Sequence, residues 1–138
     1  MKRLMILTTL LLGISLAVLA VYFINQPVSS LNGTKPDFAL SSAALYGKFV
    51  QNEDSANKQY LGKIVELSGK VKDYGADENG QMSLILEGDE LFGVNCKLNS
   101  SGKDVTPKIQ KGDQVKVKGV CSGKLMDVIL VNCSVEQG

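Results

Sequence analysis

The stretch GKIVELSGKVKD, Gly62 to Asp73, alternates apolar and polar residues through most of its length. A period of two is typical of a β-strand that buries one face and exposes the other. The segment KGDQVKVKGV, Lys111 to Val120, repeats this pattern roughly fifty residues later. The sequence therefore predicts two strands with lysines on their outer faces: Lys70 and Lys72 in the first, Lys116 and Lys118 in the second.

Three further segments show the same alternation, at residues 81–88, 91–98 and 127–135. The longest connection, Asn99 to Asp113, lies between the third and fourth strands, and its Val105 and Ile109 could cover an open barrel end. This count and spacing predict a mainly β fold, a closed five-stranded barrel of the OB type. An SH3-like barrel or half of a β-sandwich would alternate similarly. The positions expected to point inward in these three segments and in the fourth strand are Met82, Leu84, Leu86, Phe92, Val94, Cys96, Leu98, Val115, Val117, Cys121, Ile129, Val131, Cys133 and Val135.

The residues in front of the first strand, Asp37 to Tyr60, follow a helical period instead. Ser41 or Ser42 can cap one helix, and a second short helix or turn is expected to start near Asn52. We therefore expect the barrel to be preceded by one or two short α-helices.

The N-terminal segment Leu4 to Ile24 contains 21 residues without a charge. A run of this length can cross a hydrocarbon core of about 30 Å as a helix. Lys2 and Arg3 precede it, which places the N-terminus on the cytoplasmic side of a membrane and the rest of the chain outside. We expect a transmembrane signal-anchor.

The alternative is a signal peptide that is cleaved after Ala20, which would leave a secreted or periplasmic protein. The apolar run continues beyond Ala20 and is long for a signal peptide, which favours the anchor. In either case the expected organisation is a signal-anchor or signal peptide at 1–24, a linker at 25–37, and an OB-fold domain with its helical extension at 38–138.

The composition argues against several classes of function. Without Lys2 and Arg3, 13 basic side chains remain against 14 acidic ones, so no global charge attracts acidic partners. The same part of the chain contains no arginine, histidine or tryptophan. Arginine supplies bidentate phosphate and base contacts, and histidine is the usual proton-transfer group near neutral pH.

Four segments, NEDSANKQYLGKIVELSGKV, FGVNCKL, KGDQVKVKGVCSG and DVILVNCSV, occur in an order that resembles the tRNA-anticodon-like (tRNA_anti-like) family of small bacterial OB-fold proteins. The similarity covers roughly Ser41 to Val135. It implies an OB-fold in the cell envelope and assigns no ligand. Members often have a lipoprotein cysteine, and no cysteine lies directly after the apolar run here. The residues that carry the resemblance are Tyr60, Gly62, Lys63, Ser68, Gly69, Cys96, Gly119, Cys121 and Cys133.

The four lysines are the candidate ligand surface, because the first and fourth strands of an OB barrel are neighbours. They could form a strip that binds the backbone of a nucleic acid, or they could be a solvated outer face. Single-strand-binding OB domains also use stacking aromatics on the second and third strands. None of the outward positions on these two strands is aromatic: Ser83, Ile85, Glu87, Gly93, Asn95 and Lys97. Tyr74, which we expect in the first loop, is the one remaining aromatic candidate. The missing aromatics favour the solvated face.

All three cysteines are expected to point inward, and disulfides persist outside the cytoplasm. A tight hairpin would hold Cys121 opposite about Ile129, too far from Cys133 to bridge. The third and fifth strands of an OB-fold are parallel neighbours, so the candidate disulfide is Cys96 with Cys133. The alternative is three buried free thiols.

No pattern points to catalysis, a metal or a cofactor. The cysteines are not closely spaced, no histidine can join them, and the carboxylates are scattered. We expect a non-catalytic, membrane-tethered binding module whose partner is an envelope protein or a glycan. The alternative is a module that binds single-stranded nucleic acid or another polyanion through the lysines.

Overall fold

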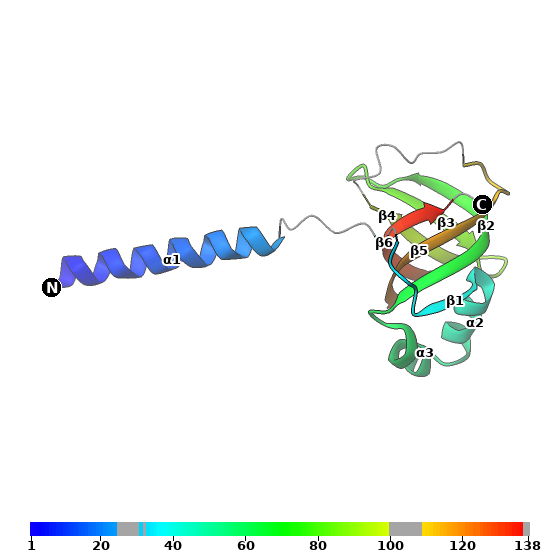
Figure 1. Cartoon of the computed structure of the whole chain (residues 1–138), viewed down its shortest axis with the longest axis horizontal. Helices are drawn as coiled ribbons and strands as arrows, with labels where there is room; N and C mark the ends of the chain where they lie inside the picture. The colour runs from blue at the N-terminus through cyan, green and yellow to red at the C-terminus, as the bar shows by residue number, and fades with distance from the viewer. Residues whose placement is uncertain (25–30, 32, 100–108, 137–138) are drawn as a thin grey trace.

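The computed structural model describes residues 1–24, 31, 33–99 and 109–136. Helix α1 (Lys2–Ile24) lies apart from a β-barrel that carries two short helices at one end (Figure 1). Within the described residues, no helix combines the length and the apolar character that a membrane span requires.

Five strands form the barrel and confirm the expected mainly β fold. The sheet order is β1-β2-β3-β4-β6-β5, and pairing of β2 with β5 closes it. As expected for an OB topology, the first barrel strand pairs with the fourth and the third runs parallel to the fifth. The barrel strands are β2 (Ile64–Ala76), β3 (Met82–Glu87), β4 (Gly93–Leu98), β5 (Gln114–Lys124) and β6 (Val128–Glu136).

A sixth strand, β1 (Phe38–Ser41), corrects the expectation that the chain is helical from Asp37 onward. It runs parallel to the start of β2, and Asp37 and Ile64 exchange two hydrogen bonds there. The Asp37 amide donates to the Ile64 carbonyl at 2.8 Å, and the Ile64 amide donates to the Asp37 carboxylate at 2.9 Å. A four-residue strand is too short to show a period, so only its neighbour identifies it.

The first helix is capped by Ser41, one of the two expected candidates, and the second begins next to Asn52, as expected. Helix α2 (Ser42–Gln51) begins after Ser41, whose hydroxyl accepts a hydrogen bond from the Ala44 amide. Helix α3 (Glu53–Tyr60) begins after Asn52, whose side chain accepts one from the Ser55 amide.

Ser42 has a different role from Ser41. It is buried, and its hydroxyl donates to the Glu87 carbonyl at 2.6 Å. A side chain on Gly69 would collide with this hydroxyl, so the glycine in β2 lets α2 dock against the barrel.

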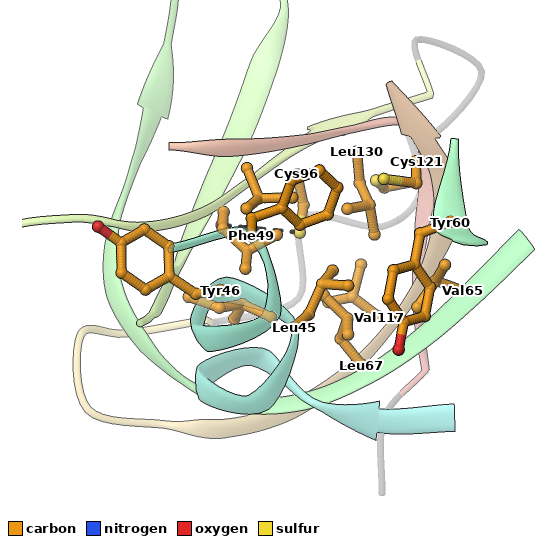
Figure 2. Close-up of a cluster of buried hydrophobic side chains, with 14 of the residues drawn as sticks. Leu45, Tyr46, Phe49, Tyr60, Val65, Leu67, Cys96, Val117, Cys121 and Leu130 are labelled. Carbon is orange, nitrogen blue, oxygen red and sulfur yellow. Dashed lines mark hydrogen bonds between the residues drawn. The ribbon is translucent and has the colours of Figure 1, made fainter. Parts of the chain in front are cut away.

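The core lies between α2, α3 and the inner face of the barrel (Figure 2). Phe49 and Leu45 enter from α2 and are 1% and 0% exposed. Within the described part of the chain, every buried core side chain belongs to the barrel and its two helices and none to α1. The buried core residues are Leu45, Tyr46, Phe49, Ala56, Tyr60, Val65, Leu67, Val71, Leu84, Leu86, Val94, Cys96, Val117, Cys121, Val128, Leu130 and Cys133.

Strand β6 changes its inward parity, so the prediction that Ile129 and Val131 point inward is wrong. Val128 and Leu130 are fully buried instead, while Cys133 returns to the expected face. β6 has one extra residue here relative to both neighbouring strands: Lys118 and Val120 of β5 pair with Ser134 and Val131. Asn132 adopts a positive φ of 55° at this bulge.

Of the two residues expected to cover the barrel end, Ile109 is partly buried against the core. Val105 lies outside the described residues.

Gly93 permits the close approach of β3 and β4, which gives a first prediction. A Cβ there would collide with the Leu86 carbonyl oxygen, which is backbone and cannot move aside. We expect Gly93→Ala to lower the free energy of unfolding by about 2–3 kcal/mol, as overpacking typically does. Denaturant unfolding of the purified chain measures this.

Gly47 provides the matched control, because it lies within α2 and a Cβ there meets no atom within 4 Å. Gly47→Ala should raise stability by up to about 1 kcal/mol through helix propensity. Equal effects of the two substitutions would contradict the role assigned to Gly93.

Candidate functional site

The predicted lysine strip, Lys70, Lys72, Lys116 and Lys118, lies on β2 and β5, but carboxylates interrupt it. In the β2–β5 ladder Lys118 is opposite Glu66, and Lys116 is opposite Ser68. Glu66 is thus beside both β5 lysines. The strip is a mixed surface and not an unbroken row of ammonium groups.

Both lysines of β5 form ion pairs. Lys116 Nζ lies 3.6 Å from Glu66 Oε1. Lys118 Nζ lies 2.8 Å from Glu136 Oε1, and Lys118 is only 5% exposed although it points outward. The hydrogen bond from Lys118 lowers the pKa of Glu136 below its ordinary value. Lys118 is therefore a covered structural cation, and a ligand would have to displace Glu136 to reach it.

The two lysines of β2 differ from each other. Lys72 Nζ donates to the backbone carbonyls of Asp89 at 3.3 Å and Glu90 at 2.9 Å, and so fastens β2 to the β3–β4 turn. Lys70 is exposed, and its ammonium group forms no side-chain hydrogen bond or ion pair with another described residue. Within the described barrel, Lys70 is the member of the strip that is most available to a ligand.

Tyr74 lies in β2 and not in the first loop, because β2 continues to Ala76 and Tyr74 pairs with Leu84. The ring is 47% exposed. Its neighbour Asp73 forms an ion pair with Lys111 at 2.9 Å, and that contact lowers the pKa of Asp73. Tyr74 is thus an isolated aromatic beside an ion pair.

The outer face of β3 and β4 is polar and aliphatic. Cross-strand pairs place Ser83 beside Lys97 and Ile85 beside Asn95. The parity change in β6 adds Ile129 next to Asn95, which sequence reasoning missed because it placed Ile129 inside. None of these outward residues is aromatic, so the described face offers no platform for base stacking.

Cys96 and Cys133 are neighbours inside the barrel. All three cysteines are free thiols in the structure, and all are buried. A hydrogen bond to Cys96, together with burial, raises the pKa of the Cys133 thiol. Gly119 leaves room for this sulfur, since a Cβ there would be 2.5 Å from Cys133 Sγ. Cys121 pairs with Leu130, one residue from the expected position, and burial raises its pKa as well.

The β3–β4 turn is held by a compact polar network. The Asp89 carboxylate accepts hydrogen bonds from the Phe92 and Leu91 amides, which lower its pKa, and from Tyr46. Burial and this contact raise the pKa of Tyr46. The network fixes the turn against α2. Among the described residues no cluster of three or more His, Cys, Asp or Glu side chains could hold a metal ion.

Two exposed apolar side chains were not singled out from the sequence: Leu125 and Met126, at the β5–β6 connection, are 79% and 66% exposed. Sequence reasoning treated this segment as an ordinary turn. The only signal was two large apolar residues in a position where polar turn residues are usual.

The described residues therefore define the class of the domain: a five-stranded OB-type barrel with two short helices at one end. The model of the tRNA_anti-like family matches residues 1–135. The chain belongs to the tRNA_anti-like family.

The fold also matches solved structures, 32 chains in all. One is a crystal structure described as a "putative nucleic acid-binding lipoprotein" from Klebsiella pneumoniae subsp. pneumoniae MGH 78578. It is 17% identical, has a TM-score of 0.59, and the match covers 81% of this chain and 100% of that one. At this identity the likeness supports the shared fold. The search of curated proteins found no match.

The Lys118–Glu136 pair predicts a pH-dependent contribution to stability. The pKa of Glu136 is lowered in the folded state, so the stabilisation is complete above the unfolded value near 4.5 and is lost as pH falls through the lower folded value. Glu136→Gln should destabilise the chain by about 1–2 kcal/mol at pH 7, because it leaves the covered Lys118 ammonium unpaired.

Chemical unfolding at pH 7 and pH 3 measures the effect, with Glu78→Gln, an exposed turn carboxylate, as the control. The difference between Glu136→Gln and the unmodified chain should shrink at pH 3. A difference that is unchanged at pH 3 would contradict the assignment.

Because Cys96 and Cys133 are neighbours inside the barrel, we still predict a disulfide between them. After exposure of the folded chain to a glutathione redox buffer of oxidising composition, non-reducing peptide mapping should find Cys96 linked to Cys133 and Cys121 free. The reason is that the first two thiols are hydrogen-bonded, whereas Cys121 lies opposite Leu130. Cys133→Ser should abolish the link, and three alkylatable thiols in the oxidised chain would refute it.

Proposed function

We propose that the chain is a membrane-tethered, non-catalytic OB-fold binding module that lies outside the cytoplasm and binds another envelope component, a protein or a glycan. The observation that carries this choice of ligand is the ion pairing of Lys116 and Lys118 with Glu66 and Glu136. Two of the four lysines that could have formed a strip for binding a polyanion are already paired with carboxylates.

The tether is the segment Leu4 to Ile24. Its support is the 21-residue run without charge, preceded by Lys2 and Arg3. Cleavage after Ala20 is the alternative and would release the same domain outside the cytoplasm. Both versions give the domain the same compartment, and they differ in whether it stays at a membrane.

The absence of catalysis is part of the proposal. It is supported by a sequence with no histidine, and by carboxylates that serve turns and ion pairs, such as Asp89 and Glu66. The buried thiols have raised pKa values at Cys121 and Cys133, which makes them poor nucleophiles.

Binding of single-stranded nucleic acid is the second candidate. One specific observation favours it: the Klebsiella protein of the same fold is described as a putative nucleic acid-binding lipoprotein. In this chain the lysines left for such a role are exposed Lys70, with Lys72 and Lys97 half-buried. With no aromatic platform beside them, they would give weak, salt-sensitive binding.

The experiment that separates the two candidates is a titration of the purified full chain, in a non-ionic detergent, with labelled single-stranded DNA and RNA. We expect no binding at micromolar concentration and physiological salt, because too few cations are free to release counterions from the phosphates. A Lys70→Ala, Lys72→Ala variant should behave in the same way.

Micromolar or tighter binding that falls steeply with salt and is lost in the double variant would overturn the proposal in favour of the second candidate. If binding is absent, crosslinking in intact cells should capture an envelope protein or glycan.

A further inference from the structure

Three exposed apolar side chains lie on two neighbouring turns at one end of the barrel, and we call Leu61, Leu125 and Met126 the hairpin patch. They are 53%, 79% and 66% exposed. Leu61 is in the α3–β2 turn, and its Cδ1 lies 3.6 Å from the position that a Cβ on Gly123 would occupy. Gly123 belongs to the β5 end that leads into Leu125 and Met126. The patch is thus formed by two neighbouring turns.

The backbone beneath the patch is well fixed. The Gly62 amide donates to the Cys121 carbonyl at 2.8 Å, and the Cys121 amide donates to the Lys63 carbonyl at 3.0 Å. The hairpin itself is closed by the Leu125 amide, which donates to the Asp127 carbonyl at 3.0 Å. These backbone hydrogen bonds therefore fix the two turns that carry the exposed side chains.

Cations flank the hairpin patch, and the nearby carboxylates serve the fold. Lys124 Nζ lies 3.3 Å from the Leu125 carbonyl, so its ammonium is beside the hairpin, and Lys63 is exposed next to Leu61. The Asp127 carboxylate accepts the Gly93 amide at 2.8 Å, and the Asp37 carboxylate accepts the Ile64 amide. Apolar side chains with lysines at their margin match a lipid surface with anionic headgroups.

The tether joins the barrel at this same end. Asp37 is hydrogen-bonded to Ile64 at the start of β2, and Ile64 pairs with Val120, just ahead of the hairpin. The linker expected at 25–37 spans at most about 45 Å when fully extended. A domain attached this closely samples the bilayer surface at high effective concentration, and its attached end meets that surface first.

We propose that the hairpin patch docks on the lipid bilayer that holds Leu4 to Ile24, with Leu125 and Met126 inserted at the headgroup level and Lys63 and Lys124 contacting anionic lipid. This inference rests on the anchor in the proposed function.

The absence of tryptophan from the sequence makes a site-specific test possible. Leu125→Trp places a single fluorophore in the hairpin patch, and Tyr74→Trp places a matched one near the other end of β2, ten residues from Ile64. Each full-length variant is reconstituted into vesicles of phosphatidylcholine and phosphatidylglycerol, with and without dibrominated acyl chains. Both positions are exposed, so neither substitution disturbs the core.

We expect the Leu125→Trp emission to shift to the blue and to be quenched at least twofold by the brominated lipid, with little change for Tyr74→Trp. Adding Met126→Glu to the Leu125→Trp chain should restore most of the emission. An unquenched Leu125→Trp, or equal quenching at both positions, would overturn the docking proposal. An unquenched probe would leave the patch as a contact for a protein partner.

Alkaline carbonate extraction of the same vesicles separates this result from the anchor. If the chain stays in the membrane while Leu125→Trp is unquenched, the result supports the anchor and contradicts the docking proposal. If the chain is extracted, the anchor is wrong, and the fluorescence after adding vesicles to the extracted chain decides the docking alone: quenching supports it, and no quenching overturns it.

Discussion

The thirteen residues of β2, Ile64–Ala76, hydrogen-bond to three other strands, and the rest of the barrel depends on them. The first half of β2 lies between β1 and β5, and the second half pairs with β3 after a register shift near Val71. The alternation along β2 supplies Val65, Leu67 and Val71 to the core. Its glycine at position 69 admits the Ser42 hydroxyl, through which α2 closes the barrel end. One strand therefore sets the closure, the interior and the position of the helices.

Much of this architecture could be predicted from the sequence because the signals are local. A period of two identified the barrel strands, the capping chemistry of Ser41 or Ser42 predicted the first helix start, and the second start was expected near Asn52. The predictions that were wrong depend on distant residues. β1 exists because β2 offers it a parallel neighbour, and the inside of β6 is shifted by a bulge at Asn132 that strict alternation does not reveal.

In the candidate site, too, the features set by local sequence could be predicted and those that depend on distant residues could not. Strand parity placed Lys118 correctly on the outer face, but its covering depends on Glu136, eighteen residues away on the next strand. The lysine pattern therefore looked more basic in sequence than it is in space. Similarly, the segment of Leu125 and Met126 is an ordinary turn in sequence, whereas in the structure Leu61, from a different part of the chain, lies near Gly123 at the base of the same hairpin.

The bulge in β6 also bears on how the chain can vary in length. The inward residues of this strand are Val128, Leu130 and Cys133, so the spacing changes from two to three at the bulge. Removing one residue between Leu130 and Cys133 would restore simple alternation and leave the same side chains inside. A related barrel one residue shorter here can thus share an identical interior. Comparison of such chains needs a gap in the middle of a strand, a place where gaps are normally penalised most.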